Sequence, residues 1–85
     1  MQIVHDRFTV GQSATARCMS DILATRMEWL SGGVVINNSS STQRLDLVFS
    51  LVNDSIHNQS YTCRVSREDG EQAEQMFVVI INGEA

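Results

Sequence analysis

The residues whose types could support catalysis or metal binding are few and far apart. The only histidines are His5 and His57, and the only cysteines are Cys18 and Cys63. Neither histidine lies near a serine-rich segment or a second metal ligand, whereas zinc sites pair ligands a few residues apart. No glycine-rich phosphate loop is present. We therefore interpret both histidines as solvated surface residues, and expect no enzymatic activity, no metal and no cofactor.

An acidic segment follows the second cysteine. It contains Glu68, Asp69, Glu71 and Glu74. Such a group could attract calcium weakly, but a calcium site needs six or more oxygen ligands held by an organised loop. The sequence indicates a solvated acidic turn.

Four asparagines stand in the Asn-x-Ser pattern that accepts N-linked glycans. They are Asn37, Asn38, Asn53 and Asn58, and all four fall in segments that we expect to be loops. Chance is the alternative explanation, since the chain is rich in serine. Four such sites in loops nevertheless favour a glycosylated extracellular domain.

Length and charge restrict the classes of protein further. A chain of 85 residues forms one small domain, here residues 1–85, and its net charge of −4 without a basic run argues against nucleic-acid binding. The longest apolar run, Phe77 to Ile81, is too short to cross a membrane. Met1 leads straight into mixed polar residues, with no signal peptide. We expect a segment excised from a longer multidomain protein.

Alternation of apolar and polar residues predicts an all-β fold. Proline is absent, and short alternating runs are separated by Gly, Asn, Asp and Ser. We expect about seven short strands, with a polar loop over residues 37–42 and another over 53–60. The residues expected to point inward are Ala14, Ala16, Cys18, Met27, Trp29, Leu45, Leu47, Phe49, Val52, Tyr61, Cys63 and Val65.

The cysteine pair alone leaves two interpretations open. Cys18 and Cys63 could be free core thiols of a cytosolic protein or one disulfide of a secreted protein.

Taken together, the spacings resemble the immunoglobulin superfamily over essentially the whole chain. Trp29 follows Cys18 by eleven residues, and Leu47-x-Phe49-x-x-Val52 precedes Tyr61-Thr62-Cys63. Gly11-Gln12-Ser13 matches the turn before the first cysteine strand, and Gly70 matches the glycine of the last hairpin. One departure is His57 to Tyr61, where the family has Asp-x-Gly-x-Tyr, so we expect an unusual turn there.

This resemblance implies a Greek-key sandwich of about seven antiparallel strands with a Cys18–Cys63 disulfide between its sheets. Trp29 would pack on the disulfide, Tyr61 would form the tyrosine corner, and Leu47 would complete the core signature. The 44 residues between the cysteines suggest the intermediate or constant-2 type rather than the variable type.

The resemblance also implies function. Most such domains are extracellular modules of adhesion molecules or receptor ectodomains that bind another protein, including a second copy of themselves. A structural spacer among neighbouring domains of a tandem array is the alternative. An intracellular sarcomere-type domain is a third, which the asparagine motifs and the cysteine pair disfavour. A spacer should be polar on both faces, whereas a recognition module should carry an apolar patch.

The parity of the last strand predicts where that patch lies. A two-residue Asp69-Gly70 turn would pair Glu68 with Glu71 and turn Met76, Val78 and Ile80 inward. Phe77 and Val79 would then point outward, on the face that carries Thr62, Glu28, Leu30 and Arg64. Leu30, Arg64, Phe77 and Val79 are therefore the candidate protein-binding residues. The first strand or a neighbouring domain could instead cover them, and a one-residue register slip would put Phe77 inside.

Overall fold

The computed structural model describes residues 1–81 as an all-β domain with antiparallel strand pairing. Alternating apolar residues give one buried side to each strand, which is why the chain forms sheets. The elements are β1 (Gln2–His5), β2 (Ala14–Ser31), β3 (Val34–Phe49), the short 3₁₀ helix η1 (Asp54–Ile56), β4 (Ser60–Ser66) and β5 (Gln72–Val78).

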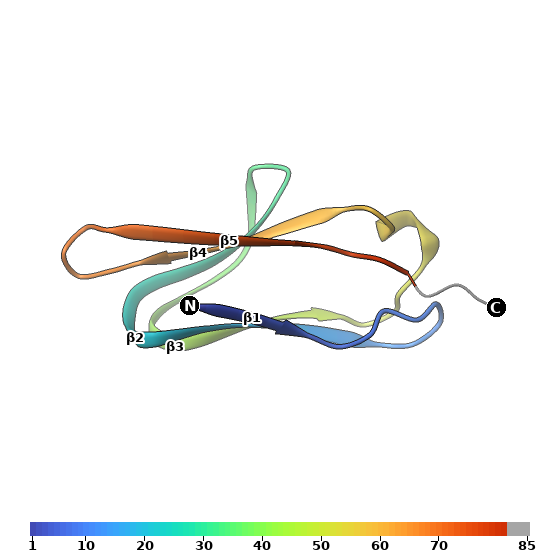
Figure 1. Ribbon diagram of the computed structural model, residues 1–85, viewed down its shortest axis with the longest axis horizontal. Coiled ribbons are helices and arrows are strands. Elements are labelled where there is room, and N and C mark those ends of the chain that lie inside the picture. Colours follow the sequence, from blue (N-terminus) through green and yellow to red (C-terminus); the bar gives the residue numbers. More distant parts are fainter. Residues whose placement is uncertain (82–85) are drawn as a thin grey trace.

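The two long strands, β2 and β3, organise the fold. The first half of β2 pairs with β1, and its second half pairs with β4, which in turn pairs with β5. β3 follows β2 along both halves, with a shift of register between Met19 and Ala24 where the strands bend. The hydrogen-bonded sheet therefore folds over on itself into two layers (Figure 1).

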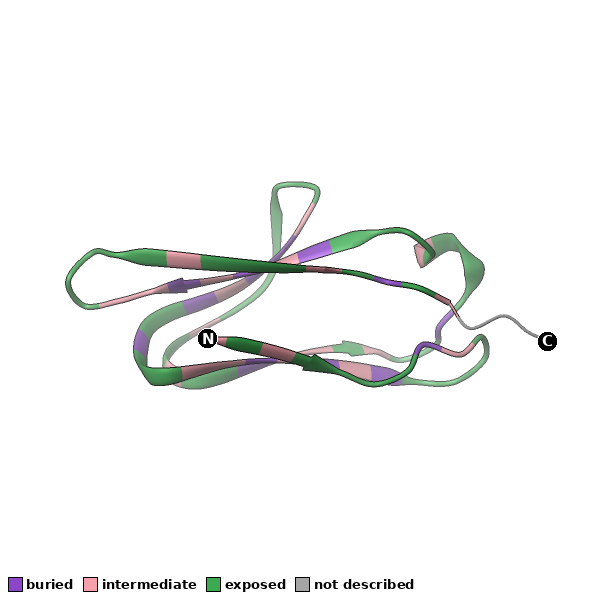
Figure 2. Cartoon of the chain, in the orientation of Figure 1, coloured by how far each residue is buried: buried purple, intermediate pink, exposed green. Residues whose placement is uncertain are grey.

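The core lies between these layers. Its buried residues come from both halves of β2, from β3 and β4, and from the segments that flank the strands (Figure 2). The inward orientation expected for β2 and β4 is confirmed, because Cys18, Met27, Trp29 and Cys63 are fully buried. Leu47 and Phe49 are only half-buried but pack against the same cluster.

A disulfide joins Cys18 to Cys63, as the resemblance implied, with 6.4 Å between the Cα atoms. Cys18 lies in the first half of β2, and Cys63 lies in β4, so the bond links the two layers. Trp29 is the direct ladder partner of Cys63, which places the indole beside the disulfide. Its Nε1 donates to the carbonyl oxygen of Leu45 at 3.0 Å.

The number of strands differs from the expected seven. The described residues form five named strands, because the chain continues as strand through the bend within β2 and through residues 37–42 within β3. Residues 37–42, expected to be a loop, lie within β3 and pair with β2. Their Asn, Ser and Thr side chains reflect the exposure of an edge strand, whose free side faces water, rather than a loop.

The predicted register of β5 is wrong by one residue. Cys63 pairs with Gln75 instead of Met76, and Tyr61 pairs with Phe77. Gly70 donates to the carbonyl of Arg67 and has a φ of 87°, which makes a three-residue loop rather than a two-residue turn. The two-residue turn would set Glu68 against Glu71, two like charges, whereas the observed loop sets Arg67 against Glu71.

This shift reverses the orientation of the apolar residues on β5 and after it. Val79 is fully buried, and Phe77 is half-buried against the core, with Trp29 and Tyr61 rings at 5.7 and 5.8 Å. Met76, Val78 and Ile80 are exposed, so their expected inward orientation is wrong. Phe8 and Val79 are core residues that the sequence analysis did not identify.

The turn before Tyr61 has the unusual shape that the missing Asp and Gly predict. Asn53 is the N-cap of η1, and Asn58 takes a left-handed conformation with a φ of 67°. The Asn58 amide donates to the carbonyl of Val79, and the Val79 amide donates to that of Gln59. The turn is thus held to the segment that follows β5.

Burial raises the pKa of the Tyr61 hydroxyl.

Candidate protein-binding face

The candidate binding face is the side of the β3–β2–β4–β5 layer that points away from the core, called here the outer face. Directly paired residues share a side of a sheet. One row across β2, β4 and β5 consists of Glu28, Arg64 and Glu74, and the next consists of Leu30, Thr62 and Met76. Since Trp29 and Cys63 point inward, both rows lie on the outer face.

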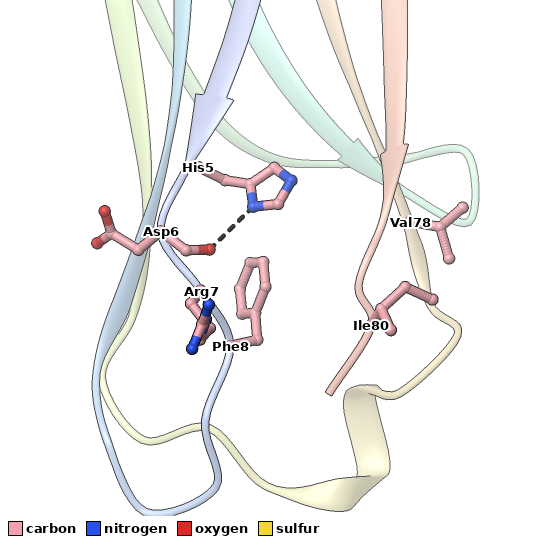
Figure 3. Close-up of a pocket in the computed structure, with 6 residues that line it drawn as sticks. All are labelled: His5, Asp6, Arg7, Phe8, Val78 and Ile80. Atoms are coloured by element: carbon pink, nitrogen blue, oxygen red, sulfur yellow. Dashed lines mark hydrogen bonds between the residues drawn. The ribbon is translucent and has the colours of Figure 1, made fainter. Parts of the chain in front are cut away.

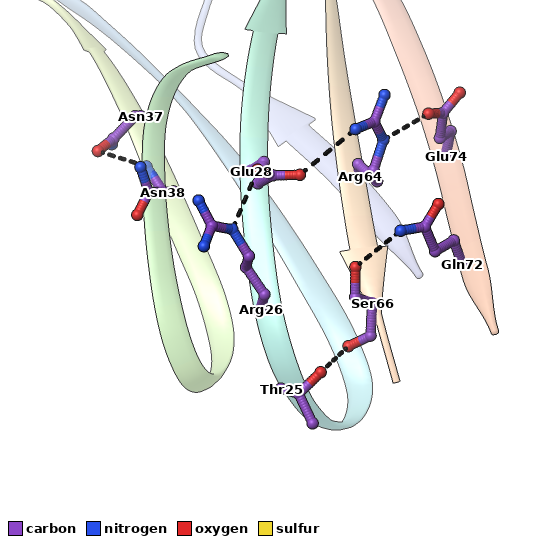
Figure 4. A network of polar contacts seen from close by, with 9 residues as sticks. All are labelled: Thr25, Arg26, Glu28, Asn37, Asn38, Arg64, Ser66, Gln72 and Glu74. Carbon is purple, nitrogen blue, oxygen red and sulfur yellow. Dashed lines mark hydrogen bonds and ion pairs between the residues drawn. The ribbon is translucent and has the colours of Figure 1, made fainter. Parts of the chain in front are cut away.

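The first row is a network of charges. Arg64 Nε lies 2.7 Å from Glu74 Oε2, and its Nη1 lies 3.5 Å from Glu28 Oε1. Arg26 Nε reaches the other oxygen of Glu28 at 3.0 Å (Figure 4). The hydrogen bond to Glu74 raises the pKa of the Arg64 guanidinium, so that group stays charged. Exposed pairs of this kind contribute little stability, roughly 0–1 kcal/mol each, but here they fix the positions of four charges.

The second row borders the charges and places two apolar residues, Leu30 and Met76, on either side of Thr62. Leu30 is only 6% exposed although it lies outside the core cluster, whereas Met76 is 59% exposed. Val78, two residues along β5 from Met76, lies on the same side and is 41% exposed. Val35, the β3 partner of Leu30, is also exposed. We call Leu30, Val35, Met76 and Val78 the apolar strip.

The four residues proposed from the sequence divide into two pairs. Leu30 and Arg64 lie on the outer face as expected. Phe77 and Val79 do not, because the register of β5 turns them into the core. Met76 and Val78 lie on the outer face instead. A three-residue hairpin loop, assumed in place of the two-residue turn, would have predicted this register.

The outward side of the other layer is different in character. Arg17 pairs with Asp6 at 3.3 Å, and Arg44 pairs with Asp46 at 2.8 Å. A hydrogen bond from the Thr15 amide, together with Arg17, holds the pKa of Asp6 below its usual value. Val48 is its most exposed apolar side chain, at 64%. Ion pairs therefore dominate this side.

A cavity of about 370 Å³ opens between the end of β1 and the chain that follows β5. Its lining is His5, Asp6, Arg7, Phe8, Val78 and Ile80 (Figure 3). His5 Nδ1 donates to the carbonyl oxygen of Asp6, and the ring stacks on Phe77 at 4.9 Å. The Asp6 carboxylate points away from the cavity, toward Thr15 and Arg17. The cavity thus lacks an acid–base pair in contact.

The other polar residues singled out from the sequence have structural partners. His57 Nδ1 accepts from the Ile81 amide at 3.0 Å. In the acidic segment, Asp69 accepts from the Glu71 amide, and Glu74 binds Arg64. Over residues 1–81, no three side chains of the metal-binding types gather into a site.

The four Asn-x-Ser sites differ in their surroundings. Asn37 and Asn38 lie in β3 rather than in the expected loop, while Asn53 and Asn58 lie in the loop before β4. Asn37 Nδ2, the atom that would carry a glycan, donates to the Asp46 carbonyl at 3.0 Å. Asn53 uses its oxygen instead, which accepts from the Ser55 amide and hydroxyl. Asn38 pairs with Glu28, so its side chain shares the outer face.

No protein-family model matches the sequence, and no curated protein matches it. Among the described residues, no helix has the length and hydrophobicity to span a membrane.

Proposed function

We propose that this chain is an extracellular immunoglobulin-like recognition domain that binds another protein through its outer face. The observation that carries the proposal is the apolar strip, in which the exposed Val35, Met76 and Val78 and the buried Leu30 lie beside fixed charges. Apolar patches with a polar rim are typical of protein contacts. A spacer needs no such patch, so the strip favours recognition over the spacer alternative.

The arrangement of the strands supports the immunoglobulin-like part of the proposal. If β2 and β3 are each divided at the bend, the chain has seven strand segments. They form two layers joined by a disulfide, with a tryptophan beside it, and immunoglobulin-like sandwiches share these features. Greek-key topology of that type is the finer assignment that we propose.

The disulfide supports the location. Disulfides persist in oxidising compartments and are rare in the cytosol. Together with the asparagine motifs, this favours the secretory pathway and the cell surface.

The Met76→Asp variant tests the binding face. Fluorescent tetramers of the domain should stain cells that display the partner, and Met76→Asp should reduce staining at least about tenfold, as loss of one central contact does. Met76 is 59% exposed, so the fold should survive. Val48→Asp is the matched control, because Val48 is 64% exposed but lies on the other layer. Equal staining by wild type and Met76→Asp would refute the face, and absence of staining on every cell type would favour the spacer.

Glycan occupancy tests the extracellular assignment. In protein secreted from eukaryotic cells, we expect glycans on Asn53 or Asn58 and none on Asn37. Asn53 and Asn58 lie in an exposed loop. The side-chain nitrogen of Asn37, in contrast, donates a hydrogen bond to the main-chain carbonyl of Asp46. Glycopeptide mass spectrometry, with Asn53→Gln and Asn58→Gln as controls, measures occupancy at each site. Full occupancy of Asn37 would contradict the site assignment, and four empty sites would count against secretion.

A further inference from the structure

The adjacent glycan-acceptor sites Asn37 and Asn38 lie on opposite sides of β3. Asn37 pairs with Trp29, and Asn38 pairs with Glu28. Paired residues share a side of a sheet. The Asn37 side chain therefore lies on the inner side of its layer, and the Asn38 side chain lies on the outer face. The two motifs overlap in sequence, but a glycan would enter different surroundings at each.

The side-chain amide of Asn37 is engaged at both ends. Its Nδ2 donates at 3.0 Å to the main-chain carbonyl of Asp46, which lies in the other half of β3. Its Oδ1 accepts from the main-chain amide of Asn38, also at 3.0 Å (Figure 4). A sugar on this Nδ2 would have to enter between the two halves of the strand and displace the bond to Asp46.

Asn38 has the surroundings that a glycan needs. It is exposed, and the hydrogen bonds within residues 1–81 use its main-chain amide but not its side chain. Figure 4 shows it at the β3 margin of the outer face, beside Glu28. N-linked glycans are bulky and occupy protein surfaces. A sugar on the Asn38 Nδ2 would therefore disturb no hydrogen bond of the described fold.

A glycan at this position would divide the outer face. Val35, the β3 member of the apolar strip, lies three residues from Asn38 on the same side of the same strand. Met76 lies on β5, three strands away from β3, which is about 14 Å at the usual spacing of strands. A bulky, solvated group beside Val35 would keep another protein away from β3, whereas Met76 and Val78 would stay accessible.

We propose that Asn38 carries an N-linked glycan that covers the β3 side of the outer face and confines the protein partner to its β4–β5 side. This inference rests on the proposed function, because it needs a secreted chain and a partner at the outer face. Met76 and Val78 then form the apolar part of the contact, and Arg64 and Glu74 form its charged margin. Val35 lies outside it.

Two variants that each remove one site of the pair test the glycan. Asn37→Gln keeps the Asn38 motif, and Asn38→Gln keeps the Asn37 motif. In protein secreted from eukaryotic cells, we expect glycopeptide mass spectrometry to find a glycan on residues 37–38 of wild type and of Asn37→Gln. We expect none in Asn38→Gln.

The contrary outcomes separate this inference from the proposed function. Loss of the glycan in Asn37→Gln but not in Asn38→Gln would overturn the site. An empty pair on a chain that is glycosylated at Asn53 or Asn58 would also overturn it and leave secretion standing. A chain that is empty at all four sites would overturn both.

Hydroxyl-radical footprinting tests which part of the face the glycan covers, and it needs no partner. Val35 should lose labelling in the glycosylated chain relative to Asn38→Gln, whereas labelling of Met76, the internal control, should not change. Equal labelling of Val35 in the two chains, or equal protection of Val35 and Met76, would overturn the divided face. If Val35 alone is protected but Met76→Asp stains cells as wild type does, the proposed binding face fails and the glycan site stands.

Discussion

Replacement of Trp29 by alanine should lower the free energy of unfolding by about 3–5 kcal/mol, the usual cost of removing a buried tryptophan. Trp29 is fully buried, its Nε1 binds the Leu45 carbonyl, and its ring meets Phe77 edge to face. The variant would leave a cavity beside the disulfide and an unpaired carbonyl. Urea denaturation of the oxidised protein measures the change.

The Trp29→Phe variant separates packing from hydrogen bonding. It keeps an aromatic ring between the layers but loses the donor to Leu45, so its cost should be closer to the roughly 1–3 kcal/mol of an unsatisfied buried carbonyl. A loss below about 1 kcal/mol for Trp29→Ala would contradict the packing described here.

The core was largely predictable from the sequence because a strand has a period of two. Once Cys18 and Trp29 are assigned inward, the alternation fixes Ala14, Ala16 and Met27 as well, and all three are buried. The disulfide needed more than periodicity, since two cysteines alone allow free thiols. The spacing shared with a known family supplied the pairing.

The register of β5 shows where sequence reasoning failed. Asp69-Gly70 is compatible with a two-residue turn and with a three-residue loop that ends in a left-handed glycine. The two differ by one residue, and one residue moves every side chain of a strand to the other face. The opposition of Glu68 and Glu71 was the physical argument against the shorter turn. The longer, three-residue loop would have placed Met76 and Val78 on the outer face.

The continuity of β2 and β3 could not be read from local pattern. Residues 37–42 are polar, and polar runs between apolar segments usually mark loops. Here a polar run forms the edge of a layer, paired with β2 on one side only. Local composition indicates whether a segment is exposed to water. Whether the segment forms a strand depends on its partner, here β2, which is distant in sequence for most of β3.

The aromatic cluster also depends on distant segments. Phe77 lies near the rings of His5, Phe8, Trp29 and Tyr61. With Phe77 included, these residues come from four separate parts of the chain. Substituting Phe77 therefore disturbs the core, which makes Met76 the informative position on β5 for tests of binding.

Removal of the disulfide should have an effect of similar size to that of Trp29→Ala, but for a different reason. The bond closes a loop with a sequence separation of 45 residues. In the chain-entropy model this restricts the unfolded chain by on the order of 4 kcal/mol. A small domain has a total stability of about 5–15 kcal/mol. The reduced chain should therefore be marginally folded at best.

Denaturation of oxidised and reduced wild type, beside a Cys18→Ala/Cys63→Ala variant, measures this loss. Reduction leaves both sulfur atoms in the core, whereas the variant removes them, so the difference between the two reports packing alone. Equal denaturation midpoints for the oxidised and reduced chains would contradict the prediction. Because Trp29 and Cys63 are direct ladder partners, the losses from Trp29→Ala and from the double alanine variant should not add. Neighbouring residues typically couple by about 0.5–3 kcal/mol, and a coupling in that range would establish that the indole and the disulfide stabilise the domain as one unit.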